Sequence, residues 1–274
     1  MLPREVAYAR PSSLAEALEL LAEAEGARAL AGGQTLVNVM KARAAAPDAL
    51  IDLNGLEELK GIELGGDGGL DLGPMTTYSE LIASAEARAR PVLGEVCAQI
   101  ADVQVRNRGT IGGNVCANDP TNHLPPLLVA LDASMTIAGP AGERTVGADE
   151  FFLGVYLTAV GPGELLTRIT VPPGRRDGFA SVTIGRDGTC IVSAAVSLER
   201  GARVALGCVD AVPHRASGVE EKLDGDTGPA AARAAAAGLG DTLEPPDDVH
   251  APASYRRRVA EVVVARAIVQ AGSR

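Results

Sequence analysis

Two short segments of the chain each contain a pair of adjacent glycines. The first runs from Ala31 to Thr35 (AGGQT) and the second from Thr110 to Asn114 (TIGGN). Because glycine has no Cβ, such a segment lets the backbone come very close to a ligand. Backbone N–H groups in a Gly-rich turn form a concavity that binds anions, and Thr110 and Asn114 add side-chain donors. A diphosphate is therefore the expected ligand.

A glycine pair by itself is a weak sign of a binding site, because most such pairs form ordinary turns. Two further pairs, at 65–66 and 68–69, are explained in that way as a hairpin loop. The segments at 31–35 and 110–114 are more informative together, since two loops of this kind can hold a dinucleotide from both sides. The sequence contains neither the G-x-G-x-x-G fingerprint of a Rossmann fold nor a Walker A motif.

The remaining reactive residue types do not have the spacing of a catalytic or metal site. The four cysteines form no C-x-x-C pair and are expected to be small buried side chains: Cys97, Cys116, Cys190 and Cys208. The three histidines are equally dispersed, and of these only His123 lies near a glycine segment. The sequence suggests no nucleophile–base pair and no carboxylate dyad, so any redox chemistry would have to come from a bound cofactor.

The overall charge argues against some classes of partner. The chain has 274 residues and a formal net charge of −10, without a cluster of Lys and Arg that has aromatic residues interleaved, so nucleic acid is not expected. The first residues lack the apolar core of a signal peptide, and charged residues interrupt the longest apolar runs, so no membrane span is expected. We expect a cytoplasmic protein with two or three folding units.

The first part of the chain, residues 1–56, is predicted to be an α/β unit. Ser13 and Glu16 have the spacing of a capping box and precede a helical pattern that ends near Gly26. A β-α-β unit follows, with strands and an intervening helix expected at 27–31, 36–44 and 49–53. The first glycine pair therefore lies in the loop between a strand and a helix.

The second part, residues 57–172, is predicted to mix helices and strands. Alternating apolar residues between 56 and 73 indicate a hairpin. Thr77 and Glu80 have capping-box spacing, which predicts a helix to about Arg90, and Pro91 begins a second helix that reaches Val105. The second glycine segment follows that helix. Strand patterns then occur at 134–138 and 165–171.

The last part, residues 173–274, begins at a boundary marked by Pro172-Pro173-Gly174 and is predicted to be a three-stranded sheet with helices. Turn residues at 186–188 and 199–201 separate three strand-like runs: 180–184, 190–198 and 202–209. Helical patterns occur later, at 216–223, 229–238 and 255–271. The basic run Tyr255–Arg258 is expected to be a solvated face or a subunit contact.

Five segments, in this order, resemble a known family. They are AGGQTL at 31–36, QVRNRGTIGGN at 104–114, DPTNHLPPLLVALDA at 119–133, FFLGVYLTAVGPGELLTRITVP at 151–172 and ASYRRRVAEVVVARA at 253–267. The segments are similar to those of the FAD-binding medium subunit of molybdenum hydroxylases, the family of carbon monoxide dehydrogenase and xanthine dehydrogenase. The resemblance covers essentially the whole chain.

This resemblance implies an α+β fold, in which a two-part FAD-binding domain of the PCMH type is followed by the sheet-and-helix domain. FAD would lie extended between the first two parts, with its diphosphate against both glycine segments. Ile100 and Leu165 would make apolar contacts to the flavin, although plain core packing explains each of them about as well. The residues implied to bind FAD are Leu30, Ala31, Gly32, Gly33, Gln34, Thr35, Leu36, Ile100, Thr110, Ile111, Gly112, Gly113, Asn114, His123 and Leu165.

Three positions depart from the family pattern. His123 stands where the family usually has an acidic residue that holds a hydroxyl of the cofactor. Ser181 aligns with a common lysine, and Cys190 aligns with an aromatic residue that often packs on the flavin ring. A neutral histidine is still a hydrogen-bond acceptor, so the substitution at His123 is compatible with binding.

The resemblance also implies a function. The chain would be an electron-transfer subunit that receives electrons from an iron–sulfur small subunit, which is supplied in turn by a molybdopterin large subunit. An acceptor such as NAD, oxygen or a quinone would take the electrons away. The three departures keep an alternative open, namely a stand-alone flavoenzyme, or a binding protein or cyclase without flavin, on the same scaffold. A purely structural subunit without cofactor is a third possibility.

Overall fold

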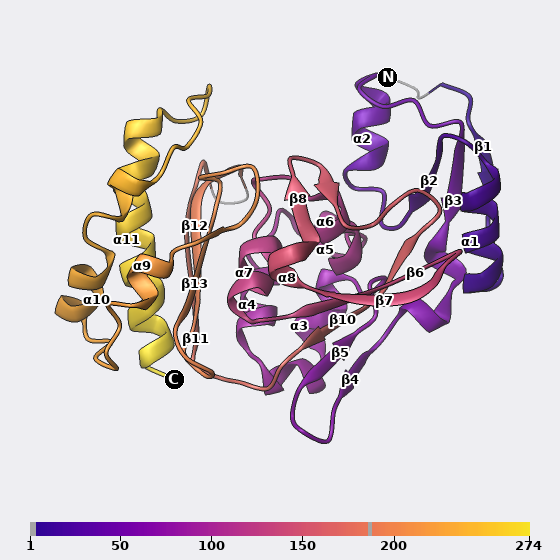
Figure 1. The fold of residues 1–274 in the computed structure, drawn as a ribbon. Coiled ribbons are helices and arrows are strands. Elements are labelled where there is room, and N and C mark those ends of the chain that lie inside the picture. Colours follow the sequence, from indigo (N-terminus) through magenta and orange to yellow (C-terminus); the bar gives the residue numbers. More distant parts are fainter. Residues whose placement is uncertain (1–3, 186–187) are drawn as a thin grey trace.

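The computed structural model describes residues 4–185 and 188–274, and Figure 1 shows three parts that follow one another along the chain. Buried apolar side chains form a cluster in each part, around Ile51, around Leu127 and around Val264. The predicted α+β fold, with its two-part region followed by a sheet and helices, is confirmed. The first cluster also includes Leu165, so the first two parts share core residues. The boundaries after 56 and 172 stay predictions.

The first part is a small parallel sheet with two helices, as the β-α-β pattern predicted. Its strands lie in the order β1-β3-β2, and all neighbours are parallel. The elements are β1 Ala7–Ala9, α1 Leu14–Glu23, β2 Ala27–Leu30, α2 Leu36–Lys41 and β3 Ala49–Asp52. The Ser13 hydroxyl caps α1 by accepting from the Glu16 N–H. The Glu16 carboxylate accepts from the N–H of Ser12 instead of Ser13, so the predicted capping box is only half formed.

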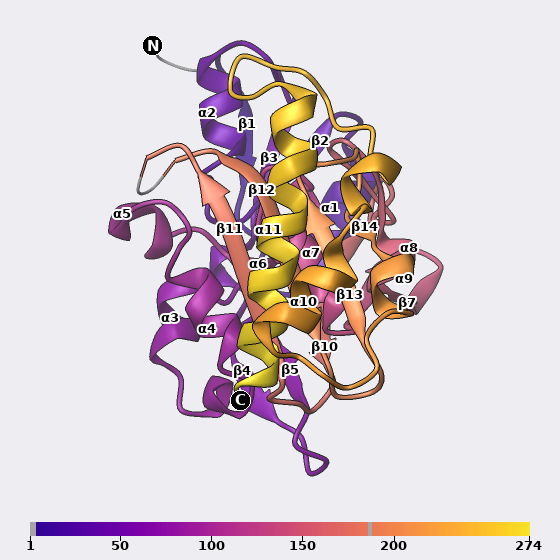
Figure 2. The ribbon, with the colours of Figure 1, turned by 90° about the vertical axis from the view of Figure 1, so that its left-hand side faces the viewer.

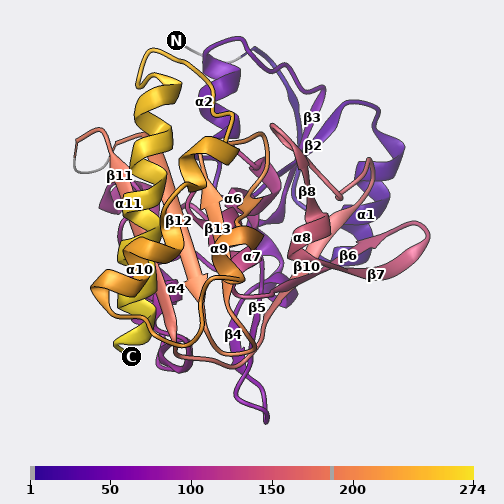
Figure 3. The same ribbon diagram turned by 60° about the vertical axis from the view of Figure 1, so that its left-hand side comes forward.

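The second part is built on an antiparallel sheet with the order β4-β5-β10-β6-β7. Its strands are β4 Ile62–Leu64, β5 Leu70–Leu72, β6 Ser134–Gly139, β7 Gly142–Gly147 and β10 Leu165–Val171. The hairpin of β4 and β5, at the lower end in Figure 3, is the one predicted from the glycine pairs at 65–69. β8 Phe152–Gly154 and β9 Leu157–Thr158 form a separate two-stranded antiparallel hairpin that is not hydrogen-bonded to this sheet.

The helices of the second part are shorter than predicted. They are η2 Glu57–Leu59, α3 Tyr78–Ala83, η3 Glu86–Ala89, α4 Val92–Cys97, α5 Val103–Arg106, α6 Ile111–Ala117, α7 Leu124–Ala130 and α8 Ala148–Phe151, while the short η1 Leu53–Gly55 ends the first part. The predictions of single helices from Thr77 to Arg90 and from Val92 to Val105 were wrong. Ser84 is extended and its hydroxyl accepts from the Ala87 N–H, and Asp102 caps a new helix by accepting from the Val105 N–H. Both residues start a new helix inside the predicted one.

The last part is an antiparallel sheet in the order β11-β12-β13-β14, covered on one face by helices (Figures 1 and 2). The elements are β11 Asp177–Thr183, β12 Cys190–Ser197, β13 Arg203–Gly207, β14 His214–Arg215, α9 Ser217–Glu220, α10 Pro229–Ala236, η4 Leu239–Thr242 and α11 Ala253–Gly272. The three predicted strands are present, and β14 extends the sheet. Of the turn predicted at 186–188, residues 186 and 187 lie outside the described residues.

Both faces of this sheet are covered, which explains why every residue of β12 is buried. Helix α11 crosses one face (Figure 2), and α7 of the second part contacts β12 and β13. Within the described residues, none of the helices combines the length and the apolar character needed to cross a membrane.

Arg256 is the exception to the expectation that the basic run Tyr255–Arg258 is a solvated face or a subunit contact, since Tyr255, Arg257 and Arg258 are exposed. Its side chain is buried, and its guanidinium donates to the carboxylate of Asp248 at 2.6 Å and to the carbonyls of Ile191 and Cys208 at 2.5 and 3.2 Å. The partners come from β12 and from the end of β13, so this arginine holds α11 on the sheet. Such partners are far away in the sequence, which is why the local pattern could not reveal them.

Candidate functional site

The second glycine segment is the first turn of a helix rather than an open turn. Thr110 is the N-cap of α6, and its hydroxyl accepts a hydrogen bond from the N–H of Gly113 at 3.0 Å. The N–H groups of Ile111 and Gly112 donate to the carbonyls of Thr76 and Pro74 at 3.0 and 2.8 Å. The expected anion concavity of N–H groups is therefore not formed here, because these groups already have partners inside the protein.

Close packing explains why glycine is needed at Gly112. A Cβ at this position would lie 2.3 Å from the Cβ of Pro74, far inside contact distance. At Gly113 a Cβ would lie 2.9 Å from the Thr110 hydroxyl oxygen and 3.5 Å from the Cβ of Ala31. Gly113 therefore faces the first glycine segment, and a side chain there would disturb the cap of α6.

The first glycine segment lies between β2 and α2 and contacts the second directly. A Cβ on Gly32 would lie 2.0 Å from the carbonyl oxygen of Arg108 and 3.0 Å from the Cα of Gly109. Gly33 has a φ of 72°, in the left-handed region that favours glycine. The carbonyl of Ala31 accepts from the Asn54 side chain at 3.0 Å. The structure thus brings together the two glycine segments that the sequence singled out. Gly33 in the first and Thr110 in the second are 77 positions apart in the chain.

Free donors are found in the first segment, not in the second. Within the described residues, the backbone N–H groups of Gly32, Gly33, Gln34 and Thr35 have no hydrogen-bond partner. The Gln34 side chain donates to the carbonyl of Gly32 at 3.1 Å, which holds the loop in shape. Successive N–H groups of this kind are suited to the oxygens of a diphosphate. They are also accessible, since these residues are only partly buried or exposed.

Asn114 adds an acceptor beside this loop. Its side chain is buried, and its Oδ1 has no hydrogen-bond partner in the described part of the chain. An unpaired buried amide oxygen costs free energy, so a donor from a ligand would be favourable here. FAD has the phosphate oxygens for the free N–H groups and the hydroxyl and amine donors for Asn114. The residues present therefore fit this cofactor.

His123 lies at the junction with the C-terminal sheet. It is 6% exposed, its ring centroid is 5.2 Å from that of Phe179 in β11, and its Nδ1 has no partner within residues 4–185 and 188–274. It also lies beside Cys190, whose thiol it influences. The aromatic partner of its ring is thus a residue of the C-terminal sheet. A contact of His123 with the cofactor stays a prediction.

The other predicted site residues occupy well-defined places. Leu30 ends β2 and Leu36 begins α2, so they flank the first glycine segment. Leu165 begins β10 and belongs to the first buried cluster, against which Ala31 packs. Ile100 is partly buried and packs against the second cluster. Core packing accounts for both Ile100 and Leu165, and their contact with a flavin stays a prediction.

Sequence reasoning missed the residues that hold the two segments together. They are Asn54, Pro74, Thr76 and the backbone of Arg108 and Gly109. Arg108 and Gly109 were part of the run RNRGTIGGN, but nothing in that run shows that a carbonyl meets Gly32. Within the described residues, no group of three or more His, Cys, Asp or Glu side chains is arranged to hold a metal ion.

Two family models match the chain. The FAD binding domain in molybdopterin dehydrogenase matches residues 4–174, which include both glycine segments. The CO dehydrogenase flavoprotein C-terminal domain matches residues 183–271. Together they cover the parts that the fold divides into a two-part region and a final sheet with helices.

Individual proteins match over the full length. The carbon monoxide dehydrogenase medium chain of Afipia carboxidovorans is 37% identical, with 100% of this chain and 99% of the relative covered. The glyceraldehyde dehydrogenase medium chain of Sulfolobus acidocaldarius is 33% identical, with 97% and 98% covered. A chain in the crystal structure of carbon monoxide dehydrogenase from Hydrogenophaga pseudoflava is 37% identical, with a TM-score of 0.93 and 100% and 99% covered.

Proposed function

The chain belongs to the family of FAD-binding domains of molybdopterin dehydrogenases, and on that premise we propose that it is the subunit through which electrons leave such an enzyme. An iron–sulfur small subunit would deliver the electrons, and a molybdopterin large subunit would oxidise the substrate. The final acceptor would be an external molecule such as NAD, oxygen or a quinone. The cytoplasmic location expected from the sequence stays a prediction.

The observation that carries this proposal is the contact between the two glycine segments. Gly32 lies against the carbonyl of Arg108, and the N–H groups from Gly32 to Thr35 have no partner among the described residues. Such a row of accessible donors at the start of a helix suits the oxygens of a phosphate. Bound FAD supplies the redox chemistry that this chain's own side chains lack.

The protein's own contribution is binding and orientation. The loop at 32–35 would hold the diphosphate, and the Oδ1 of Asn114 would accept a hydrogen bond from the cofactor. The Asn114 carbonyl is itself held by the side chain of Asn122 at 3.0 Å, which fixes the end of α6. The buried apolar clusters around Ile51 in the first part and around Leu127 in the second part keep the loop and Asn114 in place.

The partner subunits are inferred from the relatives. The matching proteins are named medium chains, and this chain covers nearly all of their length. A medium chain implies a smaller and a larger companion, so the same three-subunit arrangement is proposed here. This supports a subunit rather than a stand-alone flavoenzyme, which remains the alternative.

Two measurements test the proposal. The chain is purified from its native cells, and the co-purifying proteins are identified and analysed for iron and molybdenum; the cofactor is then extracted under denaturing conditions and separated by chromatography. We expect FAD, together with two partner chains that hold iron and molybdenum. Recovery of FAD without any partner would favour the stand-alone flavoenzyme, and absence of flavin would contradict the proposed function.

A further inference from the structure

Two cysteines that are 18 positions apart in the sequence (208 − 190) meet at the end of strands β12 and β13. The ladder between the strands pairs Ser193 with Gly207, so Cys190 and Cys208 lie just beyond its end on neighbouring strands. Arg256 supports this placement, because its Nη1 donates to the carbonyls of Ile191 and Cys208 at the same time. Both cysteines are free and buried, at 1% and 6% exposure.

The two thiols also interact with each other. The Cys208 thiol donates to the carbonyl of Pro120, whose oxygen is 3.2 Å from the Cys208 Sγ, and the sulfur of Cys190 is close enough for each thiol to shift the pKa of the other. The interaction with Cys208, helped by His123, lowers the pKa of the Cys190 thiol, and the same contact raises the pKa of Cys208. One thiol of the pair therefore loses its proton more readily than an ordinary buried cysteine.

The other two cysteines provide a contrast inside the same protein. Burial raises the pKa of Cys97 and of Cys116 to about 12. They lie in α4 and α6, and burial alone, without the influence of another thiol, raises their pKa. Thiolate character and a neighbouring thiol are the two conditions for reversible oxidation, and only the Cys190–Cys208 pair meets both in the described structure.

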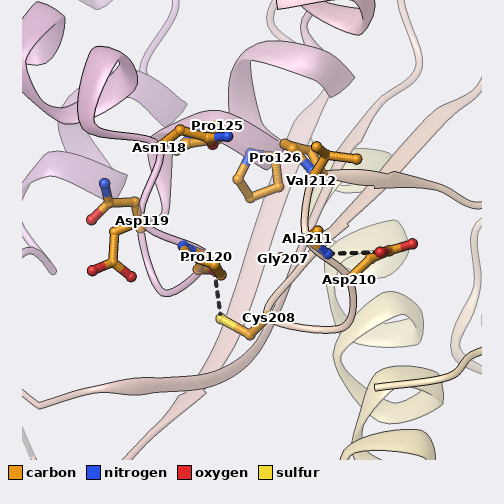
Figure 4. Close-up of a pocket in the computed structure, with 12 residues that line it drawn as sticks. Asn118, Asp119, Pro120, Pro125, Pro126, Gly207, Cys208, Asp210, Ala211 and Val212 are labelled. Carbon is orange, nitrogen blue, oxygen red and sulfur yellow. Dashed lines mark hydrogen bonds between the residues drawn. The ribbon is translucent and has the colours of Figure 1, made fainter. Parts of the chain in front are cut away.

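A small hollow reaches one member of the pair, Cys208. Cys208 lines it together with Asn118 and Pro120, from the segment between α6 and α7, and with Pro126 of α7 (Figure 4). Its volume is about 10 Å³, room for a molecule about the size of water. A bulky disulfide such as oxidised glutathione would not fit, so the oxidant that matches this hollow is a small hydroperoxide.

We propose that Cys190 and Cys208 form a reversible disulfide when hydrogen peroxide reaches them. The ionised Cys190 sulfur attacks one peroxide oxygen and breaks the O–O bond, which gives a sulfenic acid and hydroxide. The hydroxide takes the Cys208 proton and leaves as water. The Cys208 sulfur then attacks the Cys190 sulfur, the S–O bond breaks, and the second hydroxide leaves as water after taking up the proton first released by Cys190. Peroxide is reduced by two electrons, which come from the two thiols.

Oxidation would reach the neighbouring segment through Pro120. The disulfide has no S–H, so the carbonyl of Pro120 loses the donor that it has in the reduced protein. The same segment includes Asn122, which holds the carbonyl of Asn114 in α6. The redox state of the cysteine pair is thereby linked to the segment beside the cofactor loop, and amide exchange in residues 118–122 is expected to rise on oxidation.

The test is a peroxide titration of the full-length protein, followed by digestion with trypsin without reduction. Each of the four cysteines falls in a different tryptic peptide, so a disulfide joins two peptides visibly in a mass spectrum. We expect loss of two of the four free thiols, a linked species of peptides 187–200 and 204–215, and full recovery with dithiothreitol. Cys97 and Cys116 should stay reduced in the same sample.

Matched variants distinguish a specific disulfide between Cys190 and Cys208 from unspecific oxidation of the cysteines. Cys190→Ser and Cys208→Ser should each abolish the linked peptides, whereas Cys97→Ser should leave them unchanged. If either variant folds poorly, the parent protein still decides, because Cys97 and Cys116 are internal controls. Four intact thiols after peroxide treatment, or oxidation of Cys97 or Cys116 before the pair, would overturn the proposal.

Discussion

Arg90 and Asp177 form a two-point ion pair that joins the second part of the chain to the C-terminal sheet. The guanidinium Nε lies 2.8 Å from one carboxylate oxygen and its Nη2 lies 2.9 Å from the other, with the side chains 3% and 0% exposed. The Nη2 also donates to the hydroxyl of Ser197 in β12 at 3.1 Å. The junction that bears His123 and Cys190 is therefore fixed by a buried charge pair as well as by apolar contacts.

Removing one partner of this pair should be strongly destabilising. Asp177→Asn leaves the Arg90 charge buried without its counter-ion, and we expect a loss of about 3–5 kcal/mol in the free energy of unfolding. Urea denaturation measures this. Lys60→Met, which removes the exposed pair with Glu57, is the control and should cost about 0–1 kcal/mol. Equal effects of the two substitutions would contradict the role given to the buried pair.

The contact between the glycine segments predicts a second result. Gly32→Ala places a Cβ 2.0 Å from the Arg108 carbonyl, so the two segments must separate and FAD content should fall sharply. Gly113→Val should act in the same way while the independently packed C-terminal part stays folded, as limited proteolysis would show. Gly66→Ala is the matched control, since nothing lies within 4 Å of its added Cβ. Normal flavin in soluble Gly32→Ala would remove this contact from the site.

Sequence patterns predicted the elements whose signals are local. Thr77 and Glu80 form the complete capping box that begins α3, and the strand runs around Cys190 and Leu165 are strands. The predicted helices were too long because Ser84 ends α3 and its hydroxyl accepts from the Ala87 N–H, while Asp102 caps α5. Both signals were present in the sequence but were weaker than the surrounding helical pattern.

The candidate site was predictable in its segments but not in its contacts. The sequence identified the glycine segments, and their meeting depends on carbonyls from other places in the chain, such as those of Arg108 and Pro74. Which segment keeps free N–H groups is also decided by these partners. The burial of Arg256 and the meeting of Cys190 with Cys208 arise in the same way, from strands that only the folded protein places side by side.

Asp248 predicts how stability depends on acid. The pKa of Asp248 is lowered from 3.8 to about 2. The main cause is the hydrogen bond from the N–H of Ala251, and the N–H of His250 and the Arg256 guanidinium add to it. A lowered carboxyl pKa stabilises the fold above about pH 3.8, and this contribution is lost as the pH falls toward 2. Because the side chain is 38% exposed, screening limits the contribution to about 1 kcal/mol.

Asp248→Asn should therefore be less stable than the parent protein at neutral pH, by about 1 kcal/mol. The difference should shrink as the pH falls through the range from 3.8 to about 2, where the parent loses the same contribution. Thermal unfolding at a series of pH values measures both curves, with the exposed Glu63→Gln as control. A constant difference at all pH values would show that the Asp248 charge is not involved.

The last prediction concerns His123 and the cofactor. If its ring accepts a hydrogen bond from a hydroxyl of FAD, protonation turns it into a donor only and removes that interaction. The affinity for FAD should then be several-fold lower, of order 1 kcal/mol, in acidic than in neutral solution. The Nδ1 without a described partner is the atom free to make this contact, while the ring packs on Phe179.

Titrations with FAD at about pH 5.5 and about pH 8 measure this dependence. His123→Asp restores the residue usual in the family and should bind FAD at least as well, with most of the pH dependence lost, because a carboxylate stays an acceptor over that range. The same titrations are repeated with Cys190→Ser, because Cys190 is an ionisable neighbour of His123 and its charge could contribute to the pH dependence. If His123 only packs against Phe179, the parent and His123→Asp will give the same pH profile for FAD, and the cost of the substitution will appear in the free energy of unfolding.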